Sequence, residues 1–600
     1  MAAASPLANI TSLSLRITIK IDGSTMSDSY GVASINITNA VNRIPVAEIV
    51  LKGQVNIEAG TFAISDSDDF KPGKALEITA GFGDSGETSI FTGLIVKHAL
   101  DIDEATGYSL RVTCKHKAVT MTFNEKEATF ATKTDDAVIK AITGTYGLSA
   151  TVDAATDTHA FIFQHMASDW DFILARAEFN GFIIVFDGAN VTIGKPKLDA
   201  AAVLKLAVGD SIMSFSAEIN AENQPTTIEA HAWDAKTQAT ITSTAAEPSV
   251  NAQGSLTAKT MSTSLSQTAL KLISPTPMTT AELKTWAEGM LLRKRLSAFK
   301  GTIKFIGSAL AKPGCLVELE GVGARFNGTA FVSTVIHSLD TEGWSTTVKI
   351  GLDNSLINRK TDFSYMPAGG QMPAVHGLQI GTVKKLSADP DGENRIQITL
   401  PSNAETPADV WARFANFYAT GDAGSGFLPE VGDEVAVGFF DGDPRFPVVI
   451  GSMYSSKNKS PNAPKDENNY IKSITTKAKI KITMDDEKKV IKIETPGGNM
   501  ITISDEDKSI ELKDQNSNSV KLSASGIDLK SAKDINIKAT GGITLDATTK
   551  VTITAKQDVV LTGLNVQATA NVGFTAKGNA TAEISASGQT TVKGGIVMIN

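Results

Sequence analysis

The sequence has few cysteines, no long apolar run and, over roughly its last 120 residues, almost no aromatic side chains. Cys114 and Cys315 lie about 200 residues apart and are predicted to be reduced core residues, with a disulfide as the unsupported alternative. No run of about 18 apolar residues occurs, so no membrane-spanning helix is predicted. The first residues have neither a basic start nor a leucine-rich core. We therefore expect synthesis in the cytoplasm without a secretory signal.

The sequence also lacks the motifs of common catalytic and cofactor sites. None of its seven histidines has a close metal-ligand spacing, and no Walker-type loop or nucleophile elbow occurs. We expect structural or surface histidines, no catalytic residue, no metal and no cofactor. The acidic runs Asp66–Asp69 and Asp389–Gly392 lack the twelve-residue calcium loop, which favours solvated turns over ion sites. The net charge of −9 gives no indication of a nucleic-acid partner.

The C-terminal part of the chain is a ladder of short apolar–polar–apolar triplets. In its centre the triplets recur every eight residues, whereas earlier triplets such as Ile491-Lys492-Ile493 are nine to eleven residues apart. Each triplet predicts one short strand with two side chains facing inward and one facing outward. The inward residues predicted for the centre of this needle are Ile527, Leu529, Ile535, Ile537, Ile543, Leu545, Val551 and Ile553.

A short fixed period of β-branched strands is typical of a β-solenoid or β-helix. One chain alone could bury little inside such narrow coils, because the segment has so few large side chains. A fibrous prism of several identical chains solves this problem. The pattern therefore favours a rigid needle over an enzyme, with polar centres such as Asp528 and Thr552 facing solvent.

Four regions can be distinguished along the chain. Residues 1–370 are predicted to be mostly strands, interrupted by helices near Thr134–Ile142 and from Thr279 to Leu296. Within this region, the Ser-, Thr- and Ala-rich residues 237–268 are expected to be a surface excursion or linker. A break near Met366–Gly370 ends the region.

The other three regions follow this break. Residues 376–455 have dense Gly, Pro and Asp turns, which predict a small barrel of about five strands. Residues 456–478 are polar and predict a neck linker. Residues 479–600 form the needle. The linker is too short for an enzyme domain.

The predicted barrel carries the most specific motifs. Gly381-Thr382-Val383 and Trp411-Ala412-Arg413 precede FLPEVGDEV (Phe427–Val435), and the block closes with GDPRFPVVIGSMY (Gly442–Tyr454). This order resembles the OB-fold domain of VgrG proteins, the trimeric spikes of type VI secretion systems, and of the equivalent spikes of extracellular contractile injection particles and contractile phage tails. Upstream, Ser168–Phe182 is similar to the hub region of this family, where a helix leads into a strand near an Asn-Gly turn.

The resemblance implies a mainly β fold: a hub of β-barrel domains with two or more helices, an OB-fold barrel and a C-terminal intertwined trimeric β-helix needle. It implies a structural spike that links a tail tube to a PAAR-type tip and punctures a target envelope. The implied partners are two further copies of the chain, a PAAR-like tip protein, tail-tube, hub and baseplate proteins, optional effector cargo and, transiently, the target membrane. The protein would be assembled into an injection particle and then secreted or delivered.

The C-terminal strand pattern continues to the last residue. Ile596, Val597, Met598, Ile599 and Asn600 are therefore expected to dock the tip protein. The alternative function is a trimeric β-helical surface adhesin or glycan-binding tailspike, because such proteins also use trimeric β-helices. The order of hub, OB barrel and needle favours the spike. The kind of injection machine stays open.

Overall fold

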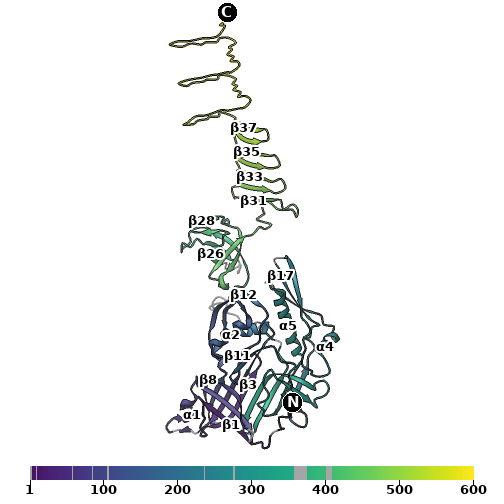
Figure 1. Cartoon of the computed structure of the whole chain (residues 1–600). Helices are drawn as coiled ribbons and strands as arrows, with labels where there is room; N and C mark the ends of the chain where they lie inside the picture. Colours follow the sequence, from purple (N-terminus) through teal and green to yellow (C-terminus); the bar gives the residue numbers. More distant parts are fainter. Residues whose placement is uncertain are drawn as a thin grey trace. The chain divides into compact units, whose positions relative to one another are not determined.

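In the computed structural model of the protein, the described residues are 3–8, 10–53, 55–56, 58–83, 86–103, 107–234, 237–274, 277–353, 355–356, 374–400 and 408–599 (Figure 1). They belong to two compact units, Met1–Gly451 and Ser452–Asn600. The predicted break at Met366–Gly370 lies outside the described residues. The boundaries of the four predicted regions stay a prediction.

The largest element of the first unit is a 13-stranded sheet. Eleven strands follow the order β16-β20-β23-β22-β3-β4-β9-β8-β7-β1-β2, while β21 pairs with both β22 and β15. Every pair is antiparallel except β15 with β21. The strands are β1 (Leu15–Ile21), β2 (Ser24–Thr25), β3 (Gly31–Ala40), β4 (Val46–Lys52), β7 (Ala75–Phe82), β8 (Thr88–Asp103), β9 (Gly107–Lys115), β15 (Leu204–Ala207), β16 (Ile212–Ile219), β20 (Phe299–Ile306), β21 (Leu316–Glu320), β22 (Gly328–Asp340) and β23 (Gly343–Ile350).

Strict alternation explains these strands. In β3, Ile35 and Ile37 are fully buried, whereas Asn36 between them is exposed. The sheet has two separate cores, one under β1, β3, β4 and β7–β9 and one under β20–β23 with β15 and β21. The pairing of β22 with β3 joins the two halves. Cys114 is buried in the first core, and both cysteines are free, as predicted.

A first helical part of this unit lies between β9 and β15. Its helices are α2 (Asp135–Thr145) and α3 (Asp169–Phe179), which share one core with the three-stranded sheet of β11 (Ser149–Val152), β13 (Ile183–Asp187) and β14 (Asn190–Gly194). The Ser168 hydroxyl caps α3 by accepting the Asp171 N–H at 3.1 Å. The predicted helix near Thr134 and the predicted helix-to-strand passage through Asn180-Gly181 are confirmed.

A second helical part surrounds α5 (Thr280–Leu296), which packs on β17 (Ile228–Asp234), β18 (Ala239–Thr244) and β19 (Leu270–Ser274). A reciprocal capping box of Thr279 and Glu282 begins α5, so this predicted helix is confirmed. Residues 237–268, expected to be a surface excursion or linker, are mostly exposed but contain β18 and α4 (Ala258–Ser264), so they are not an unstructured linker. Burial of Ala258 and Met261 against Ala298 stabilises α4 despite its polar composition.

The remaining elements of the first unit are short or paired in twos. They are β5 (Val55–Asn56), β6 (Thr61–Phe62), β10 (Glu125–Thr134), β12 (Thr158–Ser168), β27 (Ala419–Thr420), β28 (Ala423–Gly424), α1 (Ala63–Asp66) and the 3-10 turns η1 (Asp68–Phe70), η2 (Lys117–Thr122) and η5 (Phe440–Gly442). β10 and β12 form a long two-stranded ribbon, and β27 and β28 form a small hairpin.

A closed five-stranded barrel confirms the predicted OB-type element. It is formed in the order β24 (Gln379–Lys385), β25 (Ile396–Leu400), β26 (Ala408–Phe414), β30 (Pro447–Ser452) and β29 (Glu434–Phe439). Its core holds mainly β-branched side chains such as Val383, Ile398 and Val435. The described fold is therefore mainly β with several helices and an OB barrel, as the sequence indicates.

The second unit contains a seven-stranded antiparallel meander in which every strand pairs with the next along the chain (Figure 1). Its strands are β31 (Ile471–Thr475), β32 (Lys481–Asp485), β33 (Val490–Glu494), β34 (Met500–Ser504), β35 (Ser509–Lys513), β36 (Ser519–Ser523) and β37 (Gly526–Lys530). We call this meander the ladder. Residues 531–599, called the repeat segment below, form no strand within the chain.

Candidate functional site

The ladder presents one apolar face made of two straight columns of side chains. Register places Ile482 beside Ile493, Ile493 beside Ile501 and so on, because each triplet turns its outer residues to the same side. The first column is Ile474, Ile482, Ile493, Ile501, Leu512, Val520 and Leu529. The second is Met484, Ile491, Ile503, Ile510, Leu522 and Ile527.

This apolar ladder face has no covering layer within the described chain. Nine of its side chains are between 38% and 45% exposed, from Met484 at the low end to Leu512 at the high end. The remaining surface of each side chain is covered by the side chains before and after it in the same column. Burial of a large aliphatic side chain stabilises a fold by roughly 1.5–3 kcal/mol, so each position still has a substantial part of this to gain. A contiguous apolar face of this length is typical of an interaction surface.

The opposite face of the ladder is polar and charged. Its column runs through Ser473, Thr483, Lys492, Thr502, Glu511, Lys521 and Asp528. Lys521 lies directly between Glu511 and Asp528, so opposite charges are cross-strand neighbours. This column fits a solvent-facing surface. The two faces therefore have different roles: one is suited to water and the other to a protein partner.

The eight predicted needle-core residues divide into two groups. Ile527 and Leu529 lie in β37 and end the two apolar columns, at 70% and 60% exposure. The other six lie in the repeat segment, where the chain provides no paired strand. Their exposed fractions run from 53% at Val551 to 71% at Leu545. The inward orientation of these six stays a prediction.

The sequence prediction missed part of the ladder. Ile474 lies in β31, inside the segment predicted as neck linker, and Met484, which belongs to no predicted triplet, pairs with Ile491. The alternation in Ile471–Thr475 is a usable signal, although it spans only five residues. The hairpin pairing within one chain was also missed. The four- and five-residue connections, such as Thr495–Asn499, are long enough to reverse the chain direction.

The predicted tip-docking residues are strongly exposed. Ile596, Met598 and Ile599 have exposed fractions of 85%, 82% and 91%, and Val597 is 49% exposed. Asn600 lies outside the described residues. Large apolar side chains at this exposure fit a surface that another protein covers. Their role in docking stays a proposal.

The barrel also exposes large apolar side chains outside its strands. Phe417 is 87% exposed, and Phe427, Val431 and Tyr454 are 59%, 61% and 70% exposed. They fit contacts with a protein, because aromatic and aliphatic anchors are typical of interface cores. No periodic pattern predicts them, since they lie in connecting loops or beyond the last barrel strand.

The acidic run in the barrel is an internally paired turn. Arg395 donates from Nε and NH2 to Asp389 Oδ1 at 3.0 and 2.6 Å, and the Asp391 carboxylate also accepts from Arg395. These bonds from Arg395 hold the pKa of Asp389 well below its usual range. The carboxylates are therefore already occupied by a guanidinium, which supports the turn interpretation over a calcium site.

A buried polar cluster ties the two helical parts of the first unit together. Asp135, 1% exposed, accepts bonds from Arg176 Nε at 2.6 Å and Asn180 Nδ2 at 2.6 Å. His159 lies between Asp135 and Glu282, with Nδ1 3.0 Å from Glu282 Oε1. Burial raises the pKa of Asp135, but the bonds and charge of Arg176 outweigh burial and hold it below the ordinary value. This saturated network fits a structural role.

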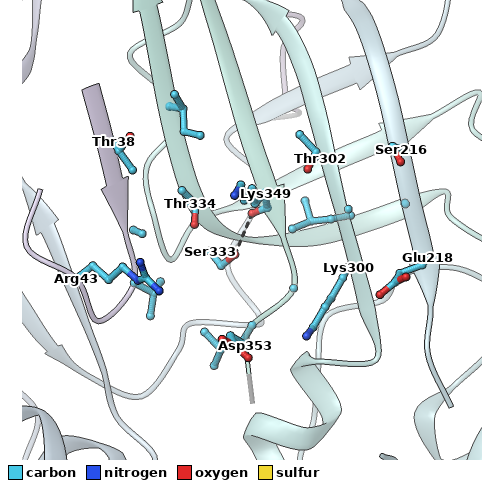
Figure 2. A pocket seen from close by; sticks show the side chains of 18 residues that line it. Thr38, Arg43, Ser216, Glu218, Lys300, Thr302, Ser333, Thr334, Lys349 and Asp353 are labelled. Atoms are coloured by element: carbon cyan, nitrogen blue, oxygen red, sulfur yellow. Dashed lines mark hydrogen bonds between the residues drawn. The ribbon is translucent and has the colours of Figure 1, made fainter. Parts of the chain in front are cut away.

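A hollow of about 730 Å³ lies on the sheet face formed by β3, β16, β20, β22 and β23 (Figure 2). Arg43, Lys300 and Lys349 line it together with Glu218 and Asp353. Four of these five side chains are exposed and Lys300 is half-buried. Both signs of charge in an open hollow do not select one class of ligand, so we assign no binding role to it.

Over the described ranges, no group of three or more His, Cys, Asp and Glu side chains could hold a metal ion. No helix in that part of the chain is both long and apolar enough to cross a bilayer. His116 and His337 are buried, and His116 Nδ1 accepts the Ala118 N–H at 3.1 Å.

Three protein-family models match this chain. Residues 379–454 match the type VI secretion system/phage-baseplate injector OB domain, which coincides with the barrel. Residues 489–541 match the phage baseplate V C-terminal trimerisation domain, which covers the ladder from β33 onward and the start of the repeat segment. Residues 11–341 match the Alg8 N-terminal domain. The trimerisation match supports a homotrimer.

Curated relatives include two Pseudomonas aeruginosa type VI secretion system spike proteins, VgrG2a and VgrG2b. Each is 33% identical over 113 residues, which is 17% of this chain and 13% and 11% of those proteins. The actin cross-linking toxin VgrG1 of Vibrio cholerae is 32% identical over 100 residues, which is 15% of this chain and 9% of the toxin. The alignments thus span only a small part of each relative.

The solved structures to which this chain is similar include a tail protein of prophage MuSo2 from Shewanella oneidensis. It has a TM-score of 0.43 at 13% identity, covering 57% of this chain and 100% of that one. A component of the E. coli type VI secretion system has a TM-score of 0.37 at 12% identity, covering 72% and 99%. A Francisella PdpA–VgrG complex has a TM-score of 0.39 at 10% identity, covering 87% and 81%.

The injector OB domain followed by the trimerisation domain makes the part of the chain from residue 379 to residue 541 similar to VgrG-type spike proteins. More than half of the chain matches a single family model. The chain belongs to the Alg8 N-terminal domain family.

Proposed function

We propose that this chain is the homotrimeric spike of a contractile injection apparatus, linking a tail tube to a PAAR-type tip and puncturing a target envelope. The observation that carries the proposal is the apolar ladder face. It is continuous over seven strands and is uncovered within the described chain. The matches to an injector OB domain and a trimerisation domain support the same reading.

Three copies solve the burial problem of the ladder. Two flat sheets could also cover each other, but the match to a trimerisation domain favours three. In a thin prism of three sheets, every apolar column faces one central axis and every charged column faces water. Closed cyclic symmetry also limits growth, because each interface is satisfied by the next copy. In the repeat segment, strands from different copies provide the backbone partners that one chain lacks.

The function of such a needle is mechanical. Stacked strands about 4.8 Å apart form a stiff rod whose backbone groups are paired, and a rod of this kind transmits an axial push without bending. Sheath contraction would drive the tube and spike toward the target. The exposed residues Ile596–Ile599 would carry the separate tip protein. No catalytic step is assigned to this chain in the proposal.

The oligomeric state tests the proposal. Mass photometry of the purified full chain at nanomolar concentration should give one species of about three times the chain mass of 63.2 kDa. The outward change Thr502→Asp should leave this species intact, which controls for added charge. A monodisperse monomer with a protease-sensitive ladder would contradict the proposed spike.

A further inference from the structure

The backbone pairing between neighbouring strands of the ladder is made within one chain. Each of its seven strands pairs with the next, and the connections between them close locally. The Thr495 N–H donates to the Asn499 carbonyl at 3.0 Å, and the Asp514 N–H donates to the Asn518 carbonyl at 3.0 Å. Hairpins of this length form from local contacts, so the ladder can order early.

The repeat segment differs in this respect. Over residues 531–599 the structure contains no strand pairing, and only Ser531 among these residues is less than 36% exposed. Order in this segment must therefore come from other chains. Three separate segments have to be brought together before any of them gains a contact, which carries a large loss of chain entropy.

The register of the repeat segment is also ambiguous. Because the triplets between Ile535 and Leu561 recur every eight residues, a chain that slips by eight there places Val551 and Ile553 where Ile543 and Leu545 should lie. All four are aliphatic, so hydrophobic burial distinguishes the two registers weakly.

The ladder has only seven strands, and its last connection, Ala524-Ser525, is shorter than the four- and five-residue connections before it. A ladder displaced by one hairpin would leave the apolar side chains of two strands beyond the ends of its neighbours. Full burial of both columns on all three chains therefore requires one mutual register.

From these contrasts we infer that the ladder, β31–β37, is the register-setting nucleus for the repeat segment. Three preformed ladders associate through their apolar faces in the single register that matches. The repeat segments then pair from residue 531 toward the C-terminal side, triplet by triplet. This inference rests on the proposed trimeric spike. It adds the direction in which the needle assembles and a separate role for each part: the ladder sets the register, and the repeat segment pairs afterwards.

Two inward substitutions in the full-length chain separate the roles. Ile501 lies in the middle of the first apolar column, between Ile493 and Leu512. Ile501→Asp should abolish protease protection of both the ladder and the repeat segment. Ile543→Asp should leave residues 471–530 protected and remove protection only in the repeat segment. Cleavage sites are mapped by mass spectrometry after limited proteolysis.

Thr502→Asp and Thr544→Asp are the matched controls, because each puts the same charge on the neighbouring outward position. Both should keep the wild-type pattern. A repeat segment that stays protected in Ile501→Asp, or a ladder that loses protection in Ile543→Asp, would overturn the inference. A wild-type protein that is monomeric, and in which protease cleaves both the ladder and the repeat segment, would instead contradict the proposed spike itself.

Discussion

At the scale of single residues, the buried imidazole of His337 shows how neighbouring groups fix a protonation state. Trp344 Nε1 donates to His337 Nδ1 at 3.3 Å, and the Thr346 hydroxyl lies 3.0 Å from the same nitrogen. A proton on Nδ1 would face the indole N–H, so the neutral ring is favoured. Burial lowers the pKa of His337 from 6.5 to about 4. Burial likewise lowers the pKa of His116 to about 4.

These two histidines predict a loss of stability in mild acid. The unfolded chain binds a proton on each imidazole below about pH 6.5, whereas the folded chain does not until about pH 4. The contribution of these two histidines to the free energy of unfolding should therefore be fully present above pH 6.5. It should decrease as the pH falls toward 4. Each group contributes up to ~3 kcal/mol. Thermal unfolding of the first unit, followed between pH 7.5 and 4.5, measures this slope.

The variant His337→Asn provides the control. Its amide oxygen can accept from Trp344 near the position of Nδ1, but the side chain does not titrate in this range. The variant should show a shallower fall in melting temperature between pH 6.5 and 4.5. An unchanged slope would mean that His337 does not contribute to the acid sensitivity.

At the scale of elements, the sequence predicts which face of a strand is apolar, because this depends on local alternation. It does not predict which strand pairs with it. The triplet Ile491-Lys492-Ile493 lies in β33 with both isoleucines on one face, as predicted. Alternation decides the face whichever strand lies alongside. For the same reason it could not distinguish a hairpin within one chain from a strand of another. The helix α5 was predictable because Thr279 and Glu282 form a local capping box.

Two misses have other physical causes. The polar residues of α4 and β18 gave no periodic signal, since their burial depends on contacts with α5 and its C-terminal end. The exposed loop residues Phe417 and Phe427 have no periodicity at all. The candidate site was thus predictable as a strand pattern, whereas its pairing and its full length required the structure.

The eight-residue period predicts that whole repeats are removable. Deleting Ile543–Lys550 brings Val551 into the place of Ile543, so the apolar pattern continues without a break. We expect a trimer with a shorter needle and full protease protection of the ladder and the remaining repeats. Deleting only Ile543–Asp546 places Ala547 and Thr549 at the inward positions. That variant should lose protection beyond residue 542, because small and polar side chains replace two aliphatic ones per chain.

Limited proteolysis followed by mass spectrometry compares the two deletions directly. Equal behaviour of the whole-repeat and half-repeat deletions would contradict the eight-residue strand period. The comparison is independent of the ladder, since both deletions leave residues 471–530 intact.

At the scale of the whole molecule, the two units differ in how far one chain can stabilise itself. The first unit buries separate cores under its large sheet, its helices and its barrel, so its elements have partners within the chain. The second unit has polar groups paired along the ladder but leaves its apolar side chains half or fully exposed. Assembly is therefore required mainly by the second unit, which is the part proposed to meet the target.

The exposed residues Ile596–Ile599 predict where a tip protein binds. Three copies would present twelve exposed apolar side chains, a surface that needs a cover. Deleting Gly594–Asn600 should leave the trimer, barrel and ladder unchanged and weaken capture of a PAAR-like partner at least tenfold, or ~1.4 kcal/mol. Thr591→Asp, a charge just outside this surface, should bind as the wild type does. Pull-down of the purified partner by each trimer gives the comparison, and undiminished capture by the deletion variant would place the tip contact elsewhere on the spike.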